Sequence, residues 1–160
     1  MKLSAILLST ALGLASAVAF AQAADNWIIS ETRSPVDYTP MVVATTYSRG
    51  ADGGAMQFSI HCRAGRVELV VAGAALTRPA GEYAITWRVD DGPPAQVAAG
   101  TPVSGTGAAF GGDAMRLLRS LPEEGNLSVR LSTRQGATHE GTFSLSGLKA
   151  VRDKVNMACK

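Results

Sequence analysis

The sequence is poor in the residues that most often carry chemistry. Its 160 residues include two cysteines and two histidines, and aromatic residues make up only 6% of the chain. Positive and negative charges nearly cancel, which leaves a formal net charge of +2. A balance this close to zero argues against nucleic acid as a partner, because nucleic-acid-binding domains concentrate basic residues on one face. With so few aromatic residues, we expect a core built mainly from valine, leucine, isoleucine and alanine.

Sequence motifs of the common enzyme classes are also missing. The chain has no G-x-S-x-G elbow, no H-E-x-x-H helix, no P-loop, and no G-x-G-x-x-G after a strand. Cys62 stands beside His61, but neighbouring residues of a strand point to opposite faces, so a thiol and imidazole pair is not expected. We interpret His61 and His139 as ordinary strand or loop histidines rather than metal ligands. The sequence therefore predicts no enzyme, no cofactor and no metal site.

Long apolar runs are confined to the amino terminus. Lys2 precedes an apolar stretch over 3–20, and Ala21-Gln22-Ala23 has the small-x-small pattern of a cleavage site. We expect a signal peptide over 1–23 and a single exported domain over 24–160, located in the periplasm or secreted. An uncleaved membrane anchor is the alternative, because the apolar run approaches spanning length. No later run is long enough to cross a bilayer, so we expect no membrane span in the exported part.

The only two cysteines are Cys62 and Cys159. An even pair in an exported chain predicts a disulfide, because the compartment is oxidising. The bridge would close a loop of about 97 residues, for which loss of chain entropy gives at most about 4 to 5 kcal/mol of stabilisation. Two independent thiols are the alternative.

Short apolar segments recur about every ten residues between turn residues, as they do in antiparallel sandwiches and barrels. In residues 56–63, Phe58, Ile60 and Cys62 alternate with polar residues, so we expect these three to face the core and His61 to face outward. The same pattern predicts the other strands, over 27–31, 41–47, 67–72, 82–89, 127–132 and 142–145. The weakly patterned segment 95–110 predicts one or two short edge strands.

Two segments have helical periodicity instead. A stripe at i, i+3, i+4 and i+7 begins at Ala114, with Asp113 placed as its cap and a proline at its end. A second stripe runs from Leu148 to Cys159. This places Cys159 on the packing face of a terminal helix, where a bridge to Cys62 would fix the helix to the sheet. The predicted fold class is mainly β: an antiparallel β-sandwich or partial barrel with one short inserted helix and a C-terminal helix.

Three arginines take outward positions on predicted strands: Arg63, Arg88 and Arg130. If they share one face, they form a candidate binding surface for the carboxylates of a wall polymer or an acidic protein. The alternative is that they are ordinary solvated strand residues. The loops 34–40 and 90–112 are a second candidate surface.

Several framework features run along the exported part. They are Trp27 near its start, the turn Ser34-Pro35-Val36-Asp37, the strand end Cys62-Arg63, the segment YAITWRVDDGP over 83–93, and FSLSGL over 143–148 before the terminal helix. Together they resemble the VasI/TagO family of type VI secretion-associated periplasmic proteins. The resemblance implies a β-rich accessory factor of the bacterial envelope, with no catalytic residues to carry over. The alanine- and glycine-rich stretch after Asp91 departs from that family. A weaker similarity is to invasion-associated locus B proteins, which carry more cysteines.

We therefore expect an exported, non-catalytic accessory or binding domain of the bacterial envelope, with type VI secretion as the setting that the resemblance implies. Its partner would be an envelope protein complex or a cell-wall glycan. One alternative is a peptidoglycan- or glycan-binding module that depends on Arg88 and Arg130. Another is an invasion-associated secreted protein. The third, an envelope hydrolase, requires turnover of muropeptides.

Overall fold

The computed structural model describes residues 26–48 and 55–160. The predicted signal peptide over 1–23 lies outside the described residues. Within them, the chain forms one nine-stranded sheet in which every pair of neighbouring strands is antiparallel, together with two α-helices. The mainly β fold predicted from the sequence is confirmed. No helix in this part of the chain is long and apolar enough to cross a membrane.

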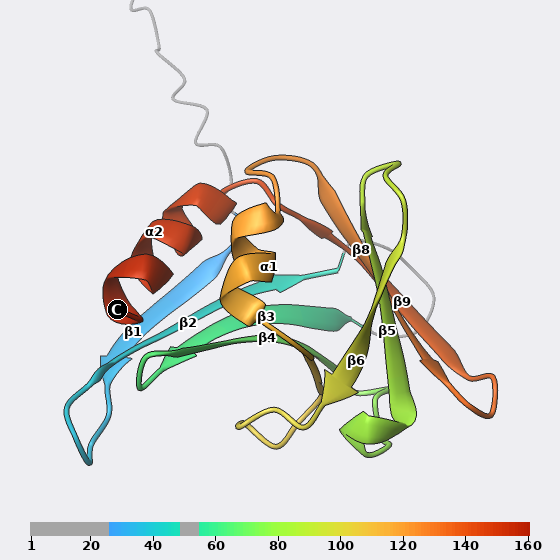
Figure 1. The fold of residues 1–160 in the computed structure, drawn as a ribbon, viewed down its shortest axis with the longest axis horizontal. Coiled ribbons are helices and arrows are strands. Elements are labelled where there is room, and N and C mark those ends of the chain that lie inside the picture. Colours follow the sequence, from blue (N-terminus) through green and yellow to red (C-terminus); the bar gives the residue numbers. More distant parts are fainter. Residues whose placement is uncertain (1–25, 49–54) are drawn as a thin grey trace, which may run out of the picture.

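The strands and helices follow one another along the chain with short connections (Figure 1). They are β1 (Ile28–Arg33), β2 (Pro40–Tyr47), β3 (Met56–Arg63), β4 (Arg66–Gly73), the 3-10 helix η1 (Ala80–Glu82), β5 (Tyr83–Val89), β6 (Ala95–Gly100), β7 (Ala108–Phe110), α1 (Ala114–Ser120), β8 (Asn126–Thr133), β9 (Thr138–Ser144) and α2 (Leu148–Ala158). Across the sheet the order is β1-β2-β3-β4-β7-β6-β5-β8-β9, so β1 and β9 are the edges. Figure 1 shows β1 to β4 as one layer, with both α-helices over one of its faces.

The segment 95–110 forms two strands, but the prediction of edge strands is wrong. β7 pairs with β4 on one side and with β6 on the other, and β6 continues to β5, so both lie in the interior of the sheet. Small residues make this position possible, because the backbone passes very close to its neighbour. A Cβ atom on Gly107 would lie 2.3 Å from the Val71 carbonyl oxygen. Alanine and glycine thus allow close packing at an interior position of the sheet, although several residues of the segment remain exposed.

The sheet bends until its two ends approach each other, as in a partial barrel. Strand β9 lies near β2 and β3, although neither is its neighbour in the sheet. A Cβ atom on Gly141 would be 3.1 Å from the Cβ atom of Ser48, which is tighter than an ordinary contact, so the absence of a side chain helps the ends to meet. At the same corner, the amide of Asn26 donates to the hydroxyl of Ser144 at 3.2 Å. The last strand starts at Thr138, four residues before the predicted start, because it pairs with β8 along its whole length.

The core lies between the two halves of the bent sheet and is centred on Phe58. Its ring has centroid distances of 6.0 Å to Trp27, 6.0 Å to Phe110 and 5.7 Å to Phe143. Phe58 is fully buried, as are the other inward residues predicted for 56–63. Edge-to-face and tilted ring pairs of this kind add about 0.5 to 1.5 kcal/mol each beyond the burial of their area. The predicted inward face of this strand is confirmed.

Both helices form where their periodicity predicts. The Asp113 carboxylate accepts a hydrogen bond from the Arg116 amide at 2.9 Å, which caps α1 as expected. Helix α2 packs its buried stripe on β2 and β3 and ends at Ala158, so Cys159 follows directly as its C-cap. The Sγ atoms of Cys62 and Cys159 are 1.97 Å apart and their Cα atoms 5.9 Å apart, so the predicted disulfide pair is present in the structure.

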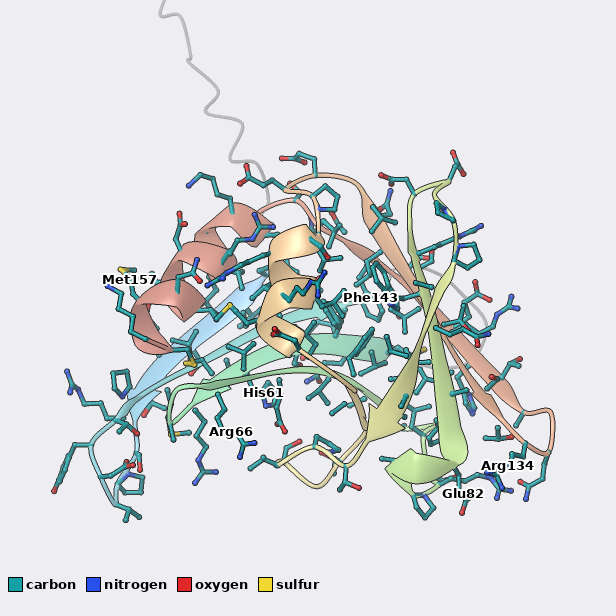
Figure 2. The ribbon with its side chains drawn as sticks, in the orientation of Figure 1. His61, Arg66, Glu82, Arg134, Phe143 and Met157 are labelled. Atoms are coloured by element: carbon teal, nitrogen blue, oxygen red, sulfur yellow. A yellow bond between two sulfur atoms is a disulfide. The ribbon has the colours of Figure 1, made fainter. Side chains whose placement is uncertain are left out.

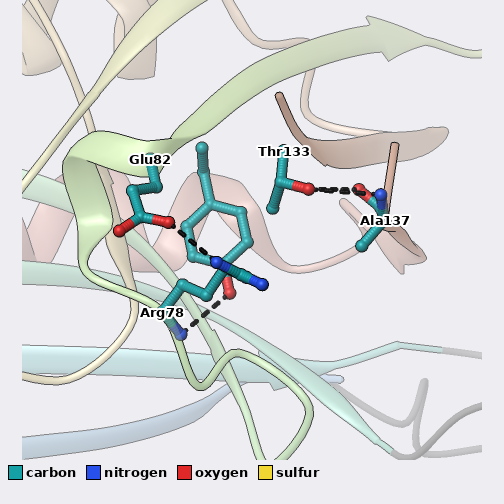
Figure 3. Close-up of polar contacts among 5 residues, drawn as sticks. Arg78, Glu82, Thr133 and Ala137 are labelled. Atoms are coloured by element: carbon teal, nitrogen blue, oxygen red, sulfur yellow. Dashed lines mark hydrogen bonds and ion pairs between the residues drawn. The ribbon is translucent and has the colours of Figure 1, made fainter. Parts of the chain in front are cut away.

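Polar contacts fix the turn that leads into β5 (Figure 3). The Arg78 guanidinium pairs with the Glu82 carboxylate at 3.1 Å, and the Arg78 amide donates to the hydroxyl of the buried Tyr83 at 3.2 Å. At the neighbouring turn, between β8 and β9, the Thr133 hydroxyl accepts from the Ala137 amide at 3.2 Å. The buried Tyr83 hydroxyl therefore has a partner, as buried polar groups require.

We expect the double variant Cys62→Ala/Cys159→Ala to unfold more readily than the wild type. The bridge spans 97 positions of the chain, and removing a native disulfide from a small exported domain costs about 2 to 5 kcal/mol. Urea unfolding followed by circular dichroism measures the difference. Reduced wild-type protein is the matched control, because it loses the same bond without losing a side chain. Equal stability of the double variant and the oxidised wild type would contradict this expectation.

Candidate functional site

The candidate site lies on the face of β2 to β4 that points away from the helices, here called the outer face. Cross-strand pairing places two rows of side chains on it: Val43, His61 and Glu68 in one, and Met41, Arg63 and Arg66 in the next. The partners in each row share a face because directly paired residues of an antiparallel sheet point the same way. Figure 2 shows His61 and Arg66 on this face, on the other side of the sheet from both helices.

Both rows line a hollow of about 570 Å³, called here the β3–β4 hollow. The loop between β6 and β7 forms a further wall, through Val103 and Ser104. The Val103 amide donates to the Glu68 carboxylate at 3.2 Å, which ties this loop to β4. Volumes between about 300 and 1,000 Å³ are typical of sites for small ligands.

The hollow exists because β4 is only partly covered along its second edge. Strand β7 is three residues long and pairs with Val70 and Val71 alone. Residues 66–69 therefore have no described strand beside them on that side. From Phe110 the chain turns toward α1 past this gap, and Phe110, Gly112 and Ala114 complete the lining. A small gap in the sheet thus becomes an accessible cavity.

Two arginines stand side by side where the hollow meets the β3–β4 turn. Arg63 and Arg66 are direct cross-strand partners, joined by the two-residue turn Ala64-Gly65, whose φ angles are 48° and 73°. Like charges directly opposite each other destabilise a strand pair. Within residues 26–48 and 55–160 neither guanidinium has an ion pair or a side-chain hydrogen bond. Their donors are free to hold an anion, which guanidinium groups do with parallel hydrogen bonds.

His61 is half-buried between these arginines and the apolar part of the hollow. Burial lowers the pKa of its imidazole, and the nearby Glu68 carboxylate opposes this only in part. The outward position predicted for His61 agrees with the strand register. It is less solvated than expected because the 101–107 loop folds over this face. A neutral imidazole leaves the two arginines and Glu68 as the charged groups that line the hollow.

The predicted arginine surface is divided between two places. Arg88 on β5 and Arg130 on β8 share the outer face of neighbouring strands, whereas β4, β7 and β6 separate them from Arg63 on β3. The Arg130 guanidinium is also bound to the Glu140 carboxylate, at 3.1 Å from Nε and 2.9 Å from Nη2. Arg63, the third predicted residue, belongs to the β3–β4 hollow.

Sequence reasoning did not find Arg66, Glu68 or Val103. A signal for Arg66 was present, since Arg63 and Arg66 flank a turn of only two residues and had to face each other. Val103 carried no such signal, because its position depends on where the 101–107 loop crosses β4.

His139, the other histidine, packs its ring edge-on against Tyr83 at 6.4 Å. Among the residues that the structure describes, no group of three or more histidine, cysteine, aspartate and glutamate side chains is placed to hold a metal.

We expect His61→Gln to make folding less sensitive to acid. Because the folded state lowers the pKa of His61 below its ordinary value of 6.5, the unfolded state takes up the proton first. The wild type should therefore lose stability as pH falls through 6.5, and the variant should lose less. Urea unfolding from about pH 8 to about pH 5 measures the two slopes.

The matched control is His139→Gln, the same change at the other histidine, which leaves the contribution of His61 in place. This variant should keep the acid-dependent loss of stability that His61 contributes. A His61→Gln slope equal to the wild-type slope would show that burial of His61 does not affect folding.

Comparison with known proteins assigns no family to this chain. No protein-family model matches it, and no curated protein and no solved structure matches it either. The resemblance to the VasI/TagO family therefore stays a prediction from its residues. What the site can do follows from its own geometry.

Proposed function

We propose that this chain is an exported, non-catalytic binding domain of the bacterial envelope, and that the β3–β4 hollow is where it binds. The observation that carries the proposal is the pair Arg63 and Arg66, two neighbouring cations without a partner among the described residues, at a cavity of ligand size. Type VI secretion is the setting that its resemblance suggests. The disulfide between Cys62 and Cys159 supports export, because such bonds persist in oxidising compartments.

Binding is favoured over catalysis by the chemistry of the groups in the hollow. Guanidinium groups keep their charge throughout the physiological range, so they hold anions and do not transfer protons. The lowered pKa of His61 favours its neutral form at neutral pH. Glu68, the one carboxylate among the described residues that line the hollow, accepts a backbone hydrogen bond from Val103 and serves to hold the loop. These groups are suited to recognition of a negatively charged partner.

Photo-crosslinking in living cells tests the proposal. A photo-reactive amino acid in place of the exposed Ser104, at the rim of the hollow, should capture a specific partner. The same residue in place of the exposed Gln135, in the distant turn between β8 and β9, should not capture it. Adding Arg63→Gln and Arg66→Gln should abolish the product from the Ser104 position, because the charged contact is removed. Capture of membrane components of a secretion machine would support the type VI setting.

Identical products from Ser104 and Gln135 would contradict the hollow as the binding surface. A product from Ser104 that survives the double arginine change would do the same, because the arginines carry the proposal.

A second candidate, peptidoglycan or glycan binding, is favoured by Arg88. Its guanidinium is free of ion pairs in the described part of the chain, unlike that of Arg130. If this face binds the wall, Arg88→Ala should reduce salt-sensitive co-sedimentation with sacculi by severalfold. Arg130→Ala should reduce it less, since Glu140 already satisfies that side chain. Equal co-sedimentation of the wild type and Arg88→Ala would exclude this surface.

A further inference from the structure

We infer that the β3–β4 hollow takes an amphipathic monoanion: a carboxylate joined to an apolar body, as in a free fatty acid. The inference rests on the proposed function, because it names the ligand of the same cavity. Two features of the hollow carry it, namely the charges at the arginine pair and the apolar character of the remaining lining.

The charges at the hollow match one negative charge. Arg63 and Arg66 supply two positive charges, and the Glu68 carboxylate supplies one negative charge across the row. The pKa of His61 is lowered by burial, so its imidazole adds no charge near neutral pH. The lining of the hollow therefore has a net charge of +1. This charge favours a carboxylate over a phosphate monoester, which carries about 1.5 to 2 negative charges at neutral pH.

The arginine pair also has the shape for a carboxylate. The side chains start from directly paired residues of a tight hairpin, so both guanidinium groups can reach the same anion. Each guanidinium has a planar fork of donors that matches two carboxylate oxygens. Binding an anion here would also relieve the repulsion between two like charges that face each other.

The rest of the hollow is suited to an apolar chain. Met41 and Val43 from β2 line it on the outer face, together with Val103. Val67 and Phe110 line it from the inner side, past the uncovered edge of β4, because Val67 pairs with the inward Cys62 and Phe110 belongs to the core. The Val103 side chain is 69% exposed, although it lies against the cavity. An exposed valine beside other apolar residues is a surface that a ligand can cover. The cavity volume equals that of roughly 20 water molecules, so the hollow holds a chain of limited length.

Binding of decanoate to the protein purified from the envelope after export tests the inference by amide NMR titration. We expect saturable shifts at the amides of residues 61–68 and 101–104. Decan-1-ol has the same chain without the carboxylate, and acetate has the carboxylate without the chain. Each should bind at least tenfold more weakly than decanoate, because each lacks one of the two recognised parts.

Substitutions in the hollow test which residues contact the carboxylate of decanoate and which contact its apolar chain. Arg63→Gln and Arg66→Gln should each weaken decanoate binding about tenfold or more, since each removes charged hydrogen bonds. Val103→Ser should weaken decanoate binding and leave acetate binding unchanged. The matched control is Arg134→Gln, which removes an exposed arginine in the turn between β8 and β9, outside the hollow, and should bind decanoate like the wild type. Unchanged circular dichroism and thermal unfolding confirm that each variant is folded.

The outcomes separate this inference from the proposed function. Decanoate binding that needs both arginines and the apolar chain supports it. Equal binding of decan-1-ol, or unchanged binding by both arginine variants, overturns it and indicates an unspecific apolar surface. No decanoate binding, with arginine-dependent crosslinks from Ser104 intact, overturns the ligand class and leaves the proposed function standing. If neither decanoate binding nor arginine-dependent crosslinks from Ser104 are found, both the ligand class and the proposed function are overturned.

Discussion

The packing of Phe58 against three other aromatic rings holds the two halves of the bent sheet together. Phe58 belongs to β3, whereas Phe110 and Phe143 come from β7 and β9, and Trp27 precedes β1. The chain has only four phenylalanines, and one of these, Phe20, lies in the predicted signal peptide. The other three phenylalanines, Phe58, Phe110 and Phe143, all belong to this one aromatic cluster. Removing such a buried ring would leave a cavity at the point where both halves meet, at a cost of about 3 to 5 kcal/mol.

The candidate site follows from how this core is enclosed. The inner face of β2 to β4 is filled by the aromatic cluster, by α2 and by the disulfide that fixes the end of α2. On the outer face the loop 101–107 lies over part of β4, and it is held there by the hydrogen bond from the Val103 amide to the Glu68 carboxylate. Because β7 is short, the covering stops before the β3–β4 turn, and the hollow remains. The short β7 strand is therefore the reason that the arginines at the β3–β4 turn remain accessible.

Periodicity in the sequence was enough to predict most strands and both helices, but not to predict which strands pair with one another. The alternation around Phe58, the cap at Asp113 and the cysteine pair all predicted local structure or a single contact, and each is found in the structure. The order of strands was not predictable in this way, because alanine and glycine in 95–110 carry no alternation. Of the site, Arg63 could be predicted as outward-facing. Its partners in the hollow depend on where a loop crosses β4, which residue spacing does not encode.

The arginine pair connects stability with the proposed binding. Two like charges opposite each other oppose folding slightly, and because both side chains are exposed, solvent screens most of this cost. A chain that only had to fold would gain by replacing one of them with an acid. An anion bound to both arginines removes the repulsion in the folded state alone, since unfolding separates Arg63 and Arg66 from the hollow. Ligand binding of this kind stabilises the fold in proportion to RT ln(1 + [L]/Kd). A pair that costs stability when empty is thus consistent with a surface that is kept for binding.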